Sequence, residues 1–179
     1  MACDLSSGRL EVCKDSVGGL KAVYFVNYGD ATGYTYDVTN TDVIDTAEAA
    51  TLYKYELKGT NSFEQVVNSS RENGTTFVEQ TLSIQLKKKD ATTLKSIKLL
   101  AYGRPHVVVR NRNNQFFLAG LEYGMELTTA NLSEGVAMGD FNGSTLTLVG
   151  MEALPANLID VVSETALATA FDGASIVTA

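Results

Sequence analysis

A long stretch of alternating residues dominates this sequence and restricts what it can fold into. From Ser62 to Leu86, side chains alternate in character along the chain, and Asn73-Gly74 interrupts the alternation once. Asn-Gly between two alternating segments is the strongest local signal for a β-hairpin, here with a type I′ turn. Strands of about eleven residues would reach about 35 Å, longer than most strands. We therefore expect a hairpin whose wholly polar tip, residues 68–75, projects beyond the body of the protein.

Other segments repeat the same period of two with β-branched and aromatic residues, a pattern typical of strands with one buried face. The first three, expected to form an antiparallel meander, are residues 20–28, 34–38 and 52–57. Further strands are predicted at residues 106–110, 115–123, 126–131 and 144–151.

One helix stands out among the strands. Asp90 is a suitable N-cap for residues 91–102, in which Leu94, Ile97 and Ala101 share one face, and Gly103 ends the helix. A short helix is predicted at residues 163–171, followed by a loose arm at 176–179.

These elements predict a mainly β fold with one packed helix. We expect one domain over residues 1–160 and a C-terminal extension over residues 161–179.

Charge is distributed unevenly along the chain. The 179 residues include 14 Lys and Arg against 21 Asp and Glu, a net charge of −7 that argues against a general nucleic-acid-binding protein. Residues 87–112 hold eight basic residues and only Asp90 as an acid, so this segment carries +7 and the rest of the chain −14. Complementary surfaces of this kind favour association between copies of the chain.

No arrangement typical of catalysis is legible, so we expect neither an enzyme nor a cofactor. His106 lies at the mouth of a buried strand, which favours a structural role. Asp140 begins a fragment of a calcium loop, but the twelfth position is Met151 instead of Glu, which favours a turn. Cys3 and Cys13 fit no zinc pattern; they are expected as free thiols, with a short disulfide as the alternative. Residues 1–9 do not resemble a signal peptide.

Lys87, Lys88 and Lys89 have three interpretations. A solvated strand end is favoured, contact with the acidic surface of a neighbouring copy comes next, and phosphate binding lacks the interleaved aromatic residues that would support it. Seven aromatic residues are expected in the sheet core instead of on a ligand platform: Tyr24, Phe25, Tyr28, Tyr34, Tyr36, Tyr53 and Tyr55.

Four segments resemble a family of virion structural proteins, the tail ring or tail tube-like proteins of crAss-like and related tailed phages. They are residues 14–27 (KDSVGGLKAVYFVN), 63–65 (FEQ) with 68–77 (NSSRENGTTF), 98–105 (KLLAYGRP) and 151–157 (MEALPAN). The resemblance covers about residues 3–160, and the family contains several paralogous ring proteins.

The resemblance implies a tail tube-like β-sandwich or barrel that forms a ring of the virion tail, a hexamer or a dodecamer, assembled in the bacterial host cytoplasm. Its partners would be copies of itself and adjacent tail or portal-vertex proteins, with no membrane. DNA would pass through the channel without specific binding, since an acidic wall repels phosphates. The alternative is a carbohydrate-binding or adhesin-type sandwich on the virion surface, with tyrosines as the sugar platform. Candidate inter-subunit residues are Phe63, Glu64, Arg71, Glu72, Phe77, Lys87, Lys88 and Lys89.

Overall fold

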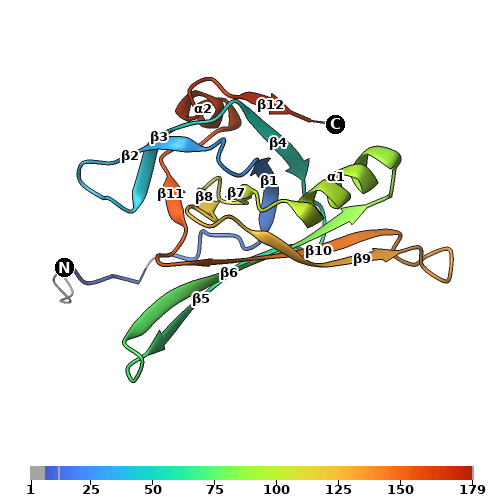
Figure 1. Cartoon of the computed structure of the whole chain (residues 1–179), viewed down its shortest axis with the longest axis horizontal. Helices are drawn as coiled ribbons and strands as arrows, with labels where there is room; N and C mark the ends of the chain where they lie inside the picture. Colours follow the sequence, from blue (N-terminus) through green and yellow to red (C-terminus); the bar gives the residue numbers. More distant parts are fainter. Residues whose placement is uncertain (1–6, 12, 179) are drawn as a thin grey trace.

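The protein is built from two β-sheets and two helices, which confirms the predicted mainly β class (Figure 1). The computed structural model describes residues 7–11 and 13–178. Sheet A contains, in spatial order, β12 (Ser175–Val177), β4 (Thr51–Glu56), β1 (Leu20–Val26), β7 (His106–Asn111), β8 (Phe116–Ala119), β11 (Asn157–Ile159), β3 (Val43–Glu48) and β2 (Thr32–Tyr36). Sheet B contains β5 (Ser62–Ser70), β6 (Thr75–Lys87), β10 (Gly143–Glu152) and β9 (Glu126–Ser133). The helices are α1 (Ala91–Tyr102) and α2 (Glu164–Ala170).

Sheet A is strongly curled, and its connectivity shows why. β3 and β4 are five positions apart in the sheet, which in a flat sheet would separate them by about 24 Å. Only Ala49 and Ala50 join the end of β3 to the start of β4, a link that spans about 10 Å at most. The sheet must therefore bend round until these strands approach each other, which gives sheet A the form of a nearly closed barrel.

Two hydrophobic cores lie on the two sides of sheet A. The first fills the inside of the curl, under α2; the second lies between the outside of the curl, sheet B and α1. β1 contributes to both, with Tyr24 in the first core and Val23 and Phe25 in the second. A strand that is buried on both faces has a continuous run of apolar residues, and positions 23–26 (VYFV) form such a run.

The expected meander of the first strands is wrong. β1 pairs with β4 and β7, and β2 pairs with β3 at the far side of the sheet. β3, β11 and β12 were not expected. β12 pairs in parallel with β4, so Ile176 and Val177 are held by the sheet edge instead of forming a loose arm, and Ala179 lies outside the described residues. The pairings that decide this topology join strands distant in sequence, which local patterns do not encode.

The long hairpin is confirmed as β5 and β6, but its turn is not of type I′. Ser70 pairs with Thr75, so four residues, Arg71 to Gly74, make the loop. Of these only Gly74 has a positive φ, 63°, whereas a type I′ turn needs two such residues. The reversal begins earlier than expected because the Ser70 hydroxyl accepts the backbone N–H of Asn73 at 3.3 Å.

Helix α1 has the predicted bounds and cap. The Asp90 carboxylate accepts the backbone N–H of Thr93 at 2.6 Å, and hydrogen bonding from Thr93 lowers the pKa of Asp90. The predicted inner face is only partly right, because Ile97 alone is buried while Leu94 is 42% exposed. The helix packs on sheet B through Ile97 and Leu100, and its other apolar side chains face solvent.

Residues beyond Asp160, expected as an extension, pack on the first core. Leu167 and Phe171 are fully buried there. Ser163 caps α2 by accepting the N–H of Ala166, and Glu164 in its first turn pairs with Lys54 of β4 at 2.9 Å. The helix closes the open side of the curl.

Candidate assembly surfaces

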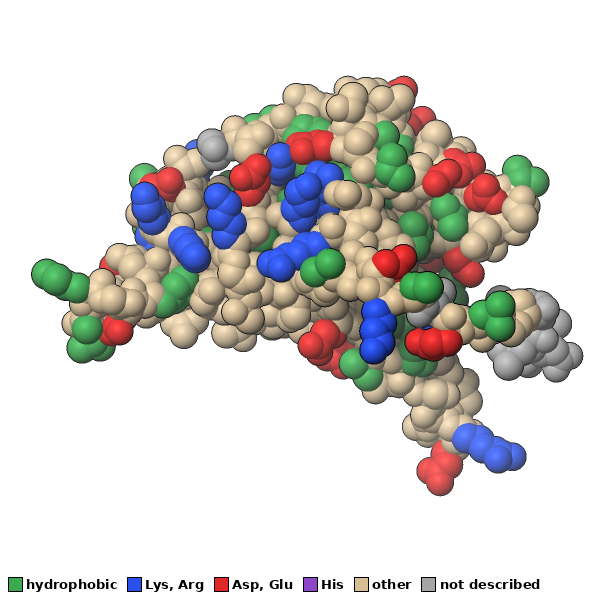
Figure 2. Space-filling view, turned by 180° about the vertical axis from the view of Figure 1, so that it is seen from behind, with side chains coloured by type: hydrophobic (Ala, Val, Ile, Leu, Met, Phe, Trp, Pro, Cys, Tyr) green, Lys and Arg blue, Asp and Glu red, His purple; other side chains and the backbone are tan. Residues whose placement is uncertain are grey.

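Most basic residues and one group of acidic residues lie at different ends of the molecule. In Figure 2 Lys and Arg gather at the left and centre, while the lobe at the upper right carries Asp and Glu without them. This lobe contains β2 and β3, which lie on the left in the opposite view of Figure 1. Residues 27–50 contain five acidic residues and no basic one. The basic segment 87–112 was recognised in the sequence; the acidic stretch that complements it was equally legible and was missed.

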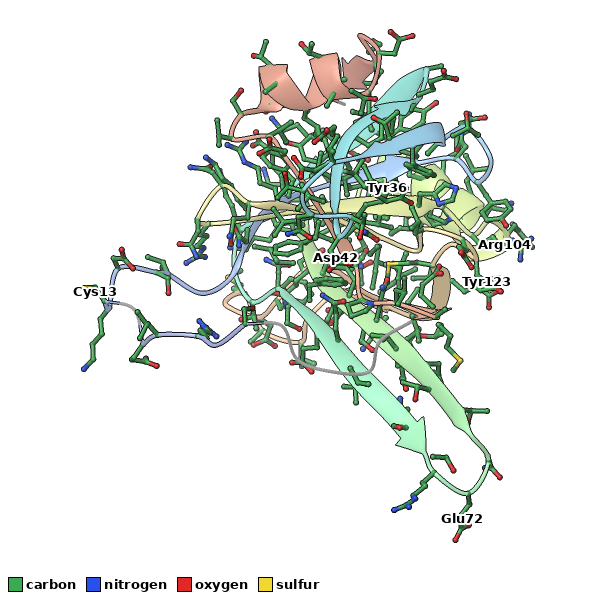
Figure 3. All side chains as sticks on the ribbon, turned by 90° about the vertical axis from the view of Figure 1, so that its left-hand side faces the viewer. Cys13, Tyr36, Asp42, Glu72, Arg104 and Tyr123 are labelled. Atoms are coloured by element: carbon green, nitrogen blue, oxygen red, sulfur yellow. The ribbon has the colours of Figure 1, made fainter. Side chains whose placement is uncertain are left out.

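The candidate contact residues of the hairpin do not all face solvent. Arg71 and Glu72 lie at the exposed tip, and Figure 3 shows Glu72 at the far end of the hairpin. Glu64 is exposed on the face of sheet B that points away from the cores, and Phe77 is 38% exposed. Phe63 instead packs against the second core. The hairpin therefore offers a polar tip and a partly apolar shaft.

The three candidate lysines differ in what they contact. Lys87 and Lys88 are exposed, and Lys88 takes a positive φ of 61° where the chain turns from β6 towards α1. The Lys89 ammonium donates to the Ser133 carbonyl at 2.9 Å and pairs with the Glu134 carboxylate. Lys89 thus ties the start of α1 to the end of β9, which leaves Lys87 and Lys88 as the free cations of the triplet.

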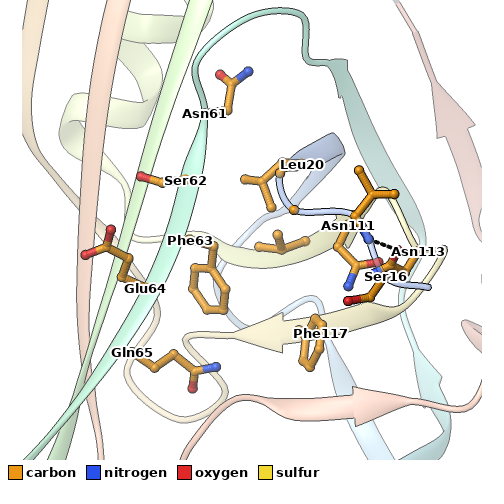
Figure 4. Close-up of a pocket in the computed structure, with 14 residues that line it drawn as sticks. Ser16, Leu20, Asn61, Ser62, Phe63, Glu64, Gln65, Asn111, Asn113 and Phe117 are labelled. Atoms are coloured by element: carbon orange, nitrogen blue, oxygen red, sulfur yellow. Dashed lines mark hydrogen bonds between the residues drawn. The ribbon is translucent and has the colours of Figure 1, made fainter. Parts of the chain in front are cut away.

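A pocket of about 500 Å³ lies at the base of the hairpin, between β5 and sheet A (Figure 4). Phe63 and Phe117 line it together with several carboxamides. The amide oxygens are already used by the protein: Asn61 accepts the N–H of Gln85 at 2.7 Å, and Asn113 accepts that of Val17 at 2.9 Å. These carboxamides anchor loops, and Ser62 and Glu64 also line the pocket.

A longer groove runs between α1 and β4. Phe25, Tyr28, Tyr53 and Tyr55 line one end, of about 500 Å³, with Leu99 and Arg104. A second section of about 620 Å³ continues along the same helix and shares Tyr53, Tyr55 and Ser96. The Arg104 guanidinium lies over the Tyr28 ring, 4.2 Å from its centroid. Of the seven aromatic residues expected in the core, Tyr28 and Tyr53 are 43% and 40% exposed. Phe25 lines the groove but belongs to the second core, and Tyr55 packs against that core.

His106 has the structural role that its position suggested. It is buried, its Nδ1 lies 2.6 Å from the Gly120 carbonyl, and its Nε2 accepts the Gly29 N–H at 3.3 Å. Tyr28 stacks on its ring at 5.2 Å. With both nitrogens bonded to backbone, the imidazole joins the loop after β1 to the loop after β8.

Among the residues that the structure describes, Glu152 is the most buried carboxylate, at the end of β10. One carboxylate oxygen accepts the backbone N–H groups of Glu122 at 3.1 Å and Tyr123 at 2.9 Å. Burial raises the pKa of Glu152, and these hydrogen bonds offset only part of that rise. Burial, with nearby Tyr36 and Glu152, also raises the pKa of Tyr34 to about 12.

Glu152→Gln is expected to stabilise the protein at pH 7. The amide oxygen can still accept both N–H groups, and the penalised buried charge is removed. Below the ordinary pKa of 4.5, Glu152 holds its proton in both the folded and the unfolded wild type. Between that pH and the raised pKa of the folded state, the unfolded chain has ionised while the folded protein still binds the proton. Wild-type stability therefore falls as the pH rises through this window. Thermal unfolding from pH 4 to pH 8 should show this fall reduced in the variant, with about 2–4 °C for each kcal/mol gained at pH 7. A variant that melts lower than wild type at pH 7 would show that the ionised form is the better acceptor.

Asp140 makes a turn, which agrees with the favoured interpretation of this loop. Its carboxylate accepts the backbone N–H groups of Val136 at 2.8 Å and Ala137 at 2.7 Å, and these bonds lower its pKa. Within residues 7–11 and 13–178, no three His, Cys, Asp or Glu side chains gather as a metal site would require. Cys13 is exposed, and Cys3 lies outside the described residues.

Neither described helix is long and apolar enough to cross a membrane. No protein-family model matches the chain, and no curated protein or solved structure matches it.

Proposed function

We propose that this protein is a structural, non-catalytic subunit of a bacteriophage tail that assembles into a ring forming part of the DNA-conducting channel. The observation that carries the proposal is the pair of free edges on sheet B. Among the described residues, β5 pairs only with β6 and β9 only with β10. Unpaired edges of nine and eight residues are a liability for a protein that works alone, because they invite pairing with other chains.

The strand directions suit a ring. Neighbouring strands of sheet B are all antiparallel, so β5 and β9 run in opposite directions. Rotation about an axis along the strands preserves their directions, so it places β9 of one copy antiparallel to β5 of the next. The contact joins two different surfaces and repeats until the ring closes. The result would be one continuous antiparallel barrel with no free edge.

The outer face of sheet B suits a channel wall. Alternation places Thr81 of β6 and Thr147 of β10 on the face opposite the second core, with Ser83 and Thr129 beside Thr147 and with Glu64 and Val149 beside Thr81. The charged residues that alternation places on this face are Glu64, Glu79, Glu126 and Lys87. Three glutamates against one lysine give a weakly acidic surface, which does not retain DNA.

The oligomeric state of the purified wild-type protein tests the proposal. Native mass spectrometry and negative-stain microscopy should show closed rings, with six or twelve copies expected. A protein that stays monomeric at every accessible concentration would overturn the proposal.

The hairpin is expected to link successive rings. Val67 and Val78 are paired, so residues 68–77 can be replaced by a two-residue Asn-Gly turn that keeps the remaining register. This shortened variant should melt close to wild type and still form single rings, but stacks of rings should become rare under the microscope. Stacking as frequent as in wild type would show that the hairpin tip has another role.

The second candidate function is carbohydrate binding on the virion surface, favoured by the tyrosines in the α1–β4 groove. A monomer that binds a glycan, with binding lost in Tyr53→Ala, would favour it over the ring.

A further inference from the structure

We infer that the groove between α1 and β4 receives the turn between β2 and β3 of a second copy of this chain. The inference rests on the proposed function in one respect only: it takes the partner to be another copy. The contact between the groove and the turn is separate from the edge pairing of sheet B, which does not require it.

The Leu99 end of the groove is an apolar surface with a basic border, whereas Glu56 and Asp90 line the second section together with three lysines. On α1, Leu99 is 62% exposed beside the groove, and Tyr53 lies on the opposite wall. Lys95 and Lys98 are exposed on the same helix, and Arg104 lines the groove at the end of α1. A partner for this surface should therefore present an aliphatic or aromatic side chain surrounded by acidic groups.

The turn between β2 and β3 has this composition. Val38 at its tip is 99% exposed, and Tyr36 beside it is also exposed. Figure 3 looks onto this side of the molecule, with Tyr36 and Asp42 labelled. The neighbouring charges are Asp37, Asp42, Asp45 and Glu48, all acidic.

The turn is held in shape before any partner arrives. The Asp37 carboxylate accepts the N–H groups of Thr39 at 2.6 Å and Asn40 at 2.7 Å. The backbone N–H of Asp37 also bonds the Val43 carbonyl at 3.0 Å. Little conformational freedom is left to lose on docking, which favours association.

The two surfaces lie where head-to-tail contact requires them. The β2–β3 turn is at the left of Figure 1 and α1 is in the right half, separated along the direction of the long strands of sheet B. A copy shifted along that direction brings its turn towards the groove, so the contact joins copies stacked along the strands. Val136 and Met138 are exposed too, but the β9–β10 loop that carries them lies at the same end as α1 and would face away from a neighbour's groove.

A disulfide-trapping experiment tests the contact directly. In a background with Cys3→Ser and Cys13→Ser, Val38→Cys and Leu99→Cys are made as separate variants, mixed in equal amounts and oxidised mildly. The mixture should give a disulfide-linked dimer joining positions 38 and 99, identified by peptide mass spectrometry. Each variant alone should give little, because the contact joins unlike surfaces. Val162→Cys, on a residue that is 78% exposed, replaces Val38→Cys in the control mixture and should give only background product.

Charge reversal supplies the second measurement. Asp42→Lys in the Val38→Cys chain should lower the yield of linked dimer several-fold, and Lys98→Glu in the Leu99→Cys chain should restore part of it. High salt should lower the yield of the Val38→Cys and Leu99→Cys mixture without charge reversal, since it screens exposed charges.

The possible outcomes distinguish a failure of the groove contact from a failure of ring formation. Rings without a 38–99 product above the control would leave the ring standing and overturn the groove contact, as would a groove occupied by a glycan or by another protein. A 38–99 product without rings would support the groove contact and count against the ring.

Discussion

Replacing Phe171 with Ala should lower the free energy of unfolding by about 3–5 kcal/mol, the range for deleting a buried aromatic ring. Phe171 is fully buried in the first core, where it follows α2 and packs inside the curl of sheet A. At about 2–4 °C per kcal/mol, the melting temperature should fall by roughly 6–20 °C. Thermal unfolding followed by circular dichroism measures the change.

Val162→Ala is the matched control, because Val162 belongs to the same C-terminal segment but is exposed. It should change stability by less than about 0.5 kcal/mol. If both variants melted like wild type, residues beyond Asp160 would be an appendage with no part in the fold. A large loss confined to Phe171→Ala would show that the barrel-like curl depends on its C-terminal helix.

What the sequence predicted correctly is encoded over short distances. The bounds of α1 follow from Asp90 and Gly103, and the hairpin follows from the alternation on both sides of Asn73-Gly74. In each case the residues that specify the element also make its hydrogen bonds, or lie within a few positions of them.

What was missed depends on contacts between distant segments. β11 and β12 have three residues each, too few for a periodic signal, and they exist because they pair in parallel with β3 and β4. Leu94 looked like a core residue on helical periodicity, but α1 lies on sheet B with another face inward.

The candidate surfaces also include features that the local sequence predicts and features that depend on distant contacts. Lys87 and Lys88 could be recognised as exposed cations from the sequence, whereas the pairing of Lys89 with Glu134 needs β9 to lie beside the start of α1. Val38 was predicted to end a strand over residues 34–38, but β2 ends at Tyr36 and the side chain of Val38 lies in solvent, 99% exposed.

A single proline at the free edge of β9 should abolish ring formation without unfolding the subunit. Ala130 and Asn131 are exposed and pair with Leu146 and Thr145 of β10. In an antiparallel ladder, successive residues alternate between bonding the partner strand and pointing their N–H and C=O groups away from it. Proline has no backbone N–H, so each variant, Ala130→Pro and Asn131→Pro, removes one N–H group. In one variant the lost N–H pointed to the free edge, and in the other it was hydrogen-bonded to β10.

Melting temperature tells the two variants apart. The proline that spares the β10 ladder should melt within a few degrees of wild type, since edge strands tolerate proline on their solvent side. That variant should run as a monomer in native mass spectrometry. Asn131→Ala keeps every N–H group and should form rings as wild type does, which separates the loss of the hydrogen bond from the loss of the side chain.

Mixing edge variants then decides how the subunits are joined. Prolines at Val66 and Val67 block the free edge of β5 in the same manner, and the one that spares the β6 ladder is again identified by its melting temperature. A β5-blocked chain keeps a working β9 edge, and a β9-blocked chain keeps a working β5 edge. If β9 of one copy pairs with β5 of the next, the mixture should form dimers of one chain of each kind and stop there, because each dimer presents two blocked edges. Dimers within a single variant would instead mean that like edges pair, which forms closed pairs and no ring.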